Sequence, residues 1–252
     1  MDTAAILEKS LLLRQERKFE LAFEHIQQAL QDGHPELKAL AWQHNPLFWQ
    51  DVSAGICILT RRRGEDAPFM RQLWQDTAFI YQFHRHSGAL PSSDQALQRI
   101  LNQEMSAIIA ESHAMHWVVR DAHRQPCGLL SLCEISPLHR RAEVLLCVLP
   151  TAPAGMAAAA MLMLYQFYFK LMKFNKLVSM VYPDNAKSLK STMHLGFQKE
   201  SHLRQHAWDP KTQSFVDLVQ LGLLKEDAFG VGNQRLMHKL LSPRPAPRLS
   251  TS

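Results

Sequence analysis

The chain has 252 residues, of which 46% are hydrophobic and 20% are charged. This balance is typical of a globular protein and excludes a disordered chain. A formal net charge of +5 is too small for this length to indicate a nucleic-acid binder, whereas it suits an enzyme with a polyanionic cofactor.

Acidic residues interrupt the apolar positions at the N-terminus, so the sequence predicts no signal peptide and we expect a cytoplasmic protein. No Asp, Glu, Lys or Arg occurs from Val144 through Phe169. Pro150, Pro153 and Gly155 divide this stretch, which favours a buried strand, turn and helix over a membrane span. The cysteines form no CxxC pair, so we expect free thiols rather than a disulfide or metal set; they are Cys57, Cys127, Cys133 and Cys147.

The first 50 residues are predicted to be a helical extension. From Ala4 to Trp49 apolar residues recur at helical spacing with charges between them. Part of this segment, from Gln15 to Ala22, resembles one tetratricopeptide-like helix pair. Because a single repeat cannot bury its own apolar face, we expect the extension to pack on the main domain, on a second copy in a homodimer, or on a protein partner.

The main domain is predicted over residues 54–229, and the Pro-rich end of the segment 230–252 is predicted to be disordered. We expect one long amphipathic helix from Glu65 to Phe83 and a second helix capped by Ser92 or Ser93. The predicted strands are Ala54–Arg63, His116–Arg120, Gly128–Ile135, Ala142–Leu149, Lys176–Tyr182, Phe197–Ala207 and Phe215–Leu224. An apolar helix is expected at Met156–Phe174 and a short one from Asp184 to about Leu195.

This order of elements resembles the GNAT superfamily of acyl-CoA N-acyltransferases. Within it, the chain resembles the branch that acetylates the N-termini of ribosomal proteins. The segments that carry the resemblance are Ile58–Arg61, Arg141–Glu143, Tyr182–Ser188, Leu195–Phe197 and Val216–Asp217. The resemblance implies an α/β (α+β) fold with a mixed central sheet flanked by helices. It also implies acetyl-CoA or another acyl-CoA as co-substrate, an amine acceptor and no metal.

The cofactor is expected at the start of the apolar helix, because free N–H groups at a helix N-terminus bind phosphate. Small residues there would let the backbone approach the phosphates. The predicted cofactor-binding residues on this side are Cys147, Val148, Leu149, Ala154, Gly155, Met156 and Ala157. The phosphate loop of the family begins with a basic or amide residue, and this chain has Ala152 at that position. Lys187 and Lys190 are the candidates to supply the missing charge.

Acyl transfer to an amine needs a base for the ammonium and an acid for the leaving thiolate. The resemblance places a carboxylate at Glu143, the predicted base, with His139 as second choice. It also places Asn185 and Ser188 beside the pantetheine arm, with Ser188 as a candidate proton donor to the thiolate. Helix capping is the other interpretation of Asn185, and a solvent-facing strand end is the other interpretation of Glu143.

Two other functions fit the sequence. One is a GNAT-like domain that has lost catalysis and serves as a binding module, which Ala152 favours. The other is an acyltransferase that takes its acyl group from acyl-carrier protein. A metal site at His84 and His86 is disfavoured, because no further ligand residues lie nearby in the sequence.

Overall fold

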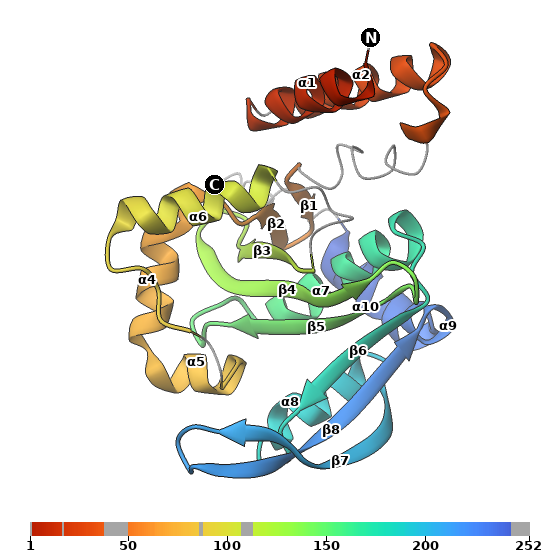
Figure 1. The fold of residues 1–252 in the computed structure, drawn as a ribbon. Coiled ribbons are helices and arrows are strands. Elements are labelled where there is room, and N and C mark those ends of the chain that lie inside the picture. Colours follow the sequence, from red (N-terminus) through yellow and green to blue (C-terminus); the bar gives the residue numbers. More distant parts are fainter. Residues whose placement is uncertain (1, 17, 38–49, 86–87, 107–112, 243–252) are drawn as a thin grey trace, which may run out of the picture.

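The computed structural model describes residues 2–16, 18–37, 50–85, 88–106 and 113–242. Its centre is one eight-stranded sheet with the strand order β1-β2-β3-β4-β5-β6-β8-β7. The strands are β1 (Val52–Ala54), β2 (Cys57–Arg61), β3 (Met115–Arg120), β4 (Pro126–Ser136), β5 (Arg141–Val148), β6 (Lys176–Val181), β7 (Gln198–Asp209) and β8 (Ser214–Leu224). All neighbours are antiparallel except β5 and β6, which α7 connects in parallel (Figure 1). The predicted mixed sheet is confirmed.

Helices cover both faces of this sheet (Figure 1). They are α1 (Thr3–Gln15), α2 (Phe19–Gln31), α4 (Ala67–Gln75), α5 (Thr77–Phe83), α6 (Asp94–Ser106), α7 (Met156–Tyr165), α8 (Ala186–His194), α9 (Lys225–Ala228) and α10 (Val231–Leu241). Single 3₁₀ turns occur at Pro35–Leu37 and Gly64–Asp66, and a π-helical turn at Gln166–Leu171 continues α7.

Two apolar cores lie on opposite faces of the sheet. Strand side chains alternate between faces, so Trp117 and Val119 of β3 pack with α7 and α10, whereas Val118 packs with α4 and α6. On the α7 face, Tyr165 and Tyr168 are fully buried. Their hydroxyls donate to the carbonyls of Leu195 at 2.9 Å and of Lys176 at 2.7 Å, which satisfies their polar atoms in the core.

The N-terminal helices form a small core of their own. Ile6, Ile26 and Leu37 are almost completely buried against one another, and α1 contacts α6. The predicted N-terminal helices are therefore present, although they are not continuous as expected from Ala4 onward: α1 ends at Gln15 and α2 begins at Phe19. The rest of that prediction, residues 38–49, lies outside the described residues. The proposed partner for this extension stays a prediction.

Two predicted elements are each divided in the structure. The predicted strand Ala54–Arg63 is a hairpin of β1 and β2, because Gly55 turns the chain with a φ of +57°. The predicted helix Glu65–Phe83 is broken between α4 and α5 at Asp76. The Asp76 carboxylate accepts from the Phe79 N–H at 2.9 Å, so it caps a new helix instead of continuing the first. Ser93 caps α6, as predicted.

The C-terminal helix α10 was not predicted. It packs on α7 and on the β1–β2 turn, where the Ile56 N–H donates to the Leu240 carbonyl at 3.4 Å. The predicted disordered end from residue 243 onward lies outside the described residues. Within the described part of the chain, no helix is long and apolar enough to cross a membrane.

Gly55→Ala is expected to destabilise the protein by about 1–3 kcal/mol through backbone strain alone, and by more through contact with α10. A Cβ on Gly55 would lie 1.8 Å from the Leu240 carbonyl oxygen. Urea unfolding measures the loss. Gly232→Ala in α10 is the control, because its Cβ would meet nothing within 4 Å. An equal loss in both variants would contradict this account of the turn.

Candidate active site

Strands β5 and β6 diverge in the middle of the sheet and open a V-shaped gap (Figure 1). Their parallel pairing ends at Glu143 and Val178, although β5 continues to Val148 and β6 to Val181. On the edge facing the gap, alternate backbone N–H and C=O groups of residues 144–148 therefore have no partner in β6. Such an edge can pair with an extended ligand that carries amide groups.

Glu143 lies where the two strands part. It is half-buried, and the Met180 backbone N–H donates to its carboxylate. Burial raises the pKa of Glu143 to about 7, the neighbouring charge of Glu134 adds to the rise, and the Met180 hydrogen bond opposes it. A carboxylate with this pKa is suited to remove a proton near neutral pH. A solvent-facing glutamate would lack this raised pKa, so the partial burial of Glu143 favours the role of base over that of a solvent-facing strand end.

Glu134, which the sequence analysis did not single out, reaches this position through an irregularity in β4. The register between β4 and β5 shifts between Cys133 and Ser136, and Glu134 has a φ of +47°. Bulges of this kind turn a side chain out of the regular alternation and are frequent beside active sites.

Glu134→Gln is expected to lower the pKa of Glu143, because it removes a negative charge that opposes ionisation of the second carboxyl. Carbon-detected NMR titration of the glutamate carboxyls measures this pKa without any substrate. Glu226→Gln, an exposed glutamate on α9, is the control. A Glu143 pKa that is the same in both variants would show that Glu134 has no influence on the site.

The first turn of α7 offers free backbone donors. Gly155 precedes the helix with a φ of +86°, as a residue without a Cβ can. In the described part of the chain, the N–H groups of Ala157 and Ala158 have no backbone acceptor, whereas Met156 N–H donates to the Pro153 carbonyl at 3.0 Å. Ala154 and Gly155 are exposed. The predicted cluster is thus present, except that the Met156 donor is already used.

The other predicted cofactor residues lie around the gap. Cys147 and Leu149 pack their partly buried side chains on the α4–α6 face, and Val148 packs on the α7 face. Asn185 caps α8: its Oδ1 accepts from the Ser188 N–H at 3.0 Å. Lys187 is exposed on the first turn of α8, and Lys190 on the next. The capping interpretation of Asn185 is confirmed.

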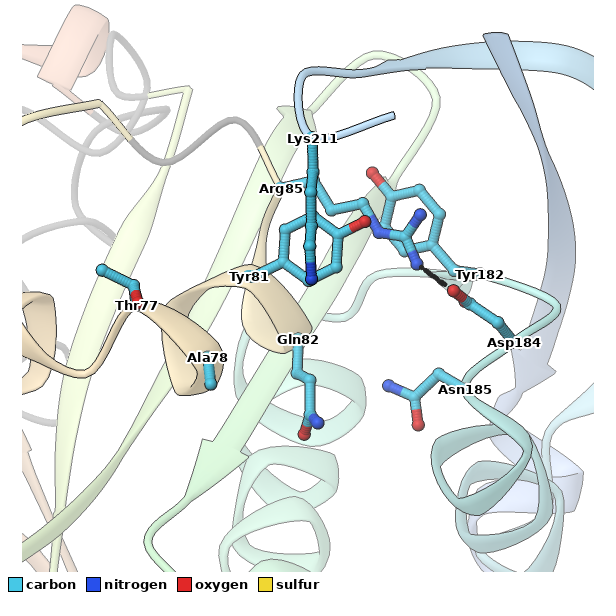
Figure 2. Close-up of a pocket in the computed structure, with 9 residues that line it drawn as sticks. All are labelled: Thr77, Ala78, Tyr81, Gln82, Arg85, Tyr182, Asp184, Asn185 and Lys211. Atoms are coloured by element: carbon cyan, nitrogen blue, oxygen red, sulfur yellow. Dashed lines mark hydrogen bonds and ion pairs between the residues drawn. The ribbon is translucent and has the colours of Figure 1, made fainter. Parts of the chain in front are cut away.

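A cavity of about 520 Å³ lies beside the gap, between α5, the start of α8 and the β7–β8 turn (Figure 2). It is lined by Thr77, Ala78, Tyr81, Gln82, Arg85, Tyr182, Asp184, Asn185 and Lys211. Tyr182 follows β6 on the same face as Glu143, because Val178 pairs with Glu143 and every second residue of a strand shares a face. The charge of Glu143 also contributes to the raised pKa of Tyr182, after burial of the ring. The cavity therefore opens on the face of the sheet that carries Glu143, although Glu143 is not one of its lining residues.

Most of these cavity residues were not predicted. Asn185 was, and Tyr182 and Asp184 stand in a motif quoted for the family resemblance. In the sequence analysis Arg85 stands only between His84 and His86, the two residues of the disfavoured metal site. His86 lies outside the described residues. His139, the second-choice base, is exposed in the turn between β4 and β5.

The sequence model of a family described as "Acetyltransferase (GNAT) domain" matches residues 57–198 of this chain. The chain belongs to the GNAT acetyltransferase family. The match covers more than half of the chain and includes the β5–β6 gap, Glu143, the start of α7 and the start of α8. This GNAT protein is an acyl-CoA N-acyltransferase.

Other comparisons agree with the family. The chain is 26% identical over 125 residues to the uncharacterized N-acetyltransferase YoaA of Bacillus subtilis, covering 49% of this chain and 70% of the relative. A spermidine N-acetyltransferase from Vibrio cholerae, solved with CoA and spermine, has a TM-score of 0.59 at 21% identity, covering 69% of this chain and 98% of its own. A dodecameric structure of the Vibrio cholerae enzyme has a TM-score of 0.56 at 22% identity, with 69% and 96% covered. At these identities the solved structures support the fold alone.

Proposed function

We propose that this chain transfers an acetyl group from acetyl-CoA, or another acyl group from its CoA thioester, to a primary amine of a protein N-terminus, a sugar or a small metabolite. The observation that carries the proposal is the position of Glu143. This carboxyl, with a pKa of about 7, lies where β5 and β6 part, on the face of the sheet on which the adjoining cavity opens. The resemblance of the chain to the ribosomal-protein branch makes a peptide N-terminus the first acceptor to test.

The residues of the chain suit a CoA thioester on the α7 side of the gap. Ala157 and Ala158 offer free N–H groups to the pyrophosphate, and the positive end of the helix dipole favours its charge. The unpaired edge of β5 offers backbone groups to the amides of the pantetheine arm. When bound, the cofactor supplies the activated acyl carbon and a thiolate leaving group.

The proposed chemistry uses two residues of this chain. Glu143 accepts a proton from the ammonium of the acceptor, which frees the nitrogen lone pair. The nitrogen attacks the thioester carbonyl, the new C–N bond forms and the C–S bond breaks. Ser188 on the first turn of α8 is the proposed proton donor to the departing sulfur, and the second proton that the nitrogen loses as the amide forms restores the Ser188 hydroxyl through solvent. The Asn185 side-chain nitrogen faces the cavity, where it can orient the acceptor or the arm (Figure 2).

A two-stage assay tests the proposal. Acetyl-CoA at about 100 times its dissociation constant should stabilise the protein by about 2.7 kcal/mol in a thermal-shift titration. Release of free CoA thiol is then measured with peptides that have a free N-terminus, with amino sugars and with simple amines. N-acetylated copies of the same peptides are the control. Absence of a shift with every acyl-CoA would reject the CoA-dependent reaction, and stabilisation by acyl-carrier protein instead would favour that donor.

A further inference from the structure

The guanidinium of Arg85 lies in a cage at one end of the cavity. Two aromatic rings form its walls: the Arg85 guanidinium carbon is 3.8 Å from the ring centre of Tyr182 and 4.6 Å from that of Tyr81. Two carboxylates complete the cage. Nη2 donates to both oxygens of Asp184 at 2.7 and 2.6 Å, and Nη1 donates to Asp209 at 2.7 Å.

This combination of groups is a cation-binding site in its own right. Aromatic faces attract cations through the ring quadrupole, and carboxylates form the strongest hydrogen bonds to charged donors. The Tyr81 hydroxyl donates to Asp209 at 2.6 Å and lowers the pKa of that carboxyl, so Asp209 carries its charge. Only 7% of the Arg85 side chain is exposed.

We propose that Arg85 fills a cation subsite of the acceptor cavity and thereby restricts the acceptor to amines without a second positive charge. The proposal rests on the function proposed above, since it takes the cavity as the acceptor site. It names a specificity-determining residue and the class of acceptor that this residue rejects, namely diamines and polyamines.

The charges of the cavity support this restriction. Arg85 and Lys211 bring two positive charges, and Asp184 and Asp209 bring two negative ones that Arg85 already binds. The Lys211 ammonium lies 5.2 Å from the ring centre of Tyr81, on the wall of the same cage. A second ammonium on the acceptor would therefore find both carboxylates already paired with Arg85 and would lie near the like charge of Lys211.

The hydrogen bonds of the cage reach only the outer end of the Arg85 head group. The cage satisfies both terminal nitrogens of Arg85. Its Nε, in contrast, is buried and has no hydrogen-bond partner among the described residues.

Arg85→Ala should vacate the cage and leave its two rings and two carboxylates in place. We expect 1,4-diaminobutane to raise the thermal midpoint of this variant at a concentration at least tenfold lower than it does for the unchanged protein. Butylamine, which has one charge, should show no such difference. The matched control is Arg71→Ala on α4, since Arg71 also pairs with a carboxylate, Asp94, but lies outside the cavity.

Turnover gives a second reading. The ratio of kcat/KM for 1,4-diaminobutane to that for butylamine should rise at least tenfold in Arg85→Ala, and Arg85→Lys, which keeps the charge, should retain the original ratio. Arg85→Gln carries the same tests if the alanine variant does not fold. Diamine binding that is the same in a folded Arg85→Ala or Arg85→Gln variant as in the unchanged protein overturns the proposal. The proposal is also overturned if neither variant folds when methylguanidinium is added to replace the missing head group. Failure of the unchanged protein to bind any acyl-CoA would instead reject the proposed function. The diamine-binding test does not depend on turnover, so the two failures can be told apart.

Discussion

Replacing Glu143 by Gln is expected to lower kcat by about 10²- to 10⁴-fold, the usual contribution of a positioned general base. The amide has nearly the shape of the carboxyl, so it can still fit between Met180 and β4, but it cannot accept the proton of the acceptor ammonium. Acetyl-CoA binding should be unchanged, because the free N–H groups on α7 are not altered. Single-turnover kinetics with the acceptor found by the assay above, together with a thermal-shift titration, measure both quantities.

The pH dependence gives an independent check on the same residue. Only the ionised carboxylate can act as base, so activity of the unchanged protein should fall as the pH drops below about 7, the raised pKa of Glu143. Glu143→Gln should lose this acid limb and retain a low, flatter rate. Full activity in the variant, with the limb intact, would remove Glu143 from the role of base.

The fold should not suffer from this substitution. A carboxyl whose pKa is higher in the folded state than in the unfolded chain favours folding while it is protonated, and this contribution is lost as the pH rises from about 4.5 to about 7. At pH 8 the unchanged protein therefore holds a buried charge that the glutamine variant lacks. We expect Glu143→Gln to be at least as stable as the unchanged protein at pH 8, which separates a chemical loss from a loss of folding.

Much of the fold follows from sequence because local patterns specify it. The apolar run of Ala142–Leu149 and the glycine at 155 are local signals, and the strand and the start of the helix lie close to where they are predicted. The break at Asp76 and the turn at Gly55 were missed for the opposite reason. Each depends on one residue inside a longer apolar pattern, and the side-chain cap of Asp76 prevails over that pattern.

The site was less predictable, because its chemistry arises from residues that are distant in sequence. Arg85 and Asp209 form an ion pair although 124 positions separate them, and no local sequence pattern predicts such a pair. The sequence also gives no pKa for Glu143. Its rise depends on burial by the fold and on Glu134, which a bulge brings near it.

Ala157→Glu is the second substitution with a large expected effect, and it should act in opposite directions on stability and on binding. A carboxylate in the first turn of α7 complements the helix dipole, so the unliganded protein should gain about 0.3–1 kcal/mol. The same carboxylate would lie beside the proposed pyrophosphate site. There we expect the dissociation constant of acetyl-CoA to rise at least about tenfold, equivalent to about 1.4 kcal/mol.

Ala157→Gln is the matched control, because it adds nearly the same volume at the same half-buried position without a charge. Calorimetric titration of all three proteins with acetyl-CoA, at low and high salt, isolates the electrostatic part, since screening should narrow the difference between Glu and Gln. Equal dissociation constants for the two variants would place the pyrophosphate away from α7. Lys187 and Lys190 on α8 would then be the groups to replace, because they are the remaining basic candidates beside the gap.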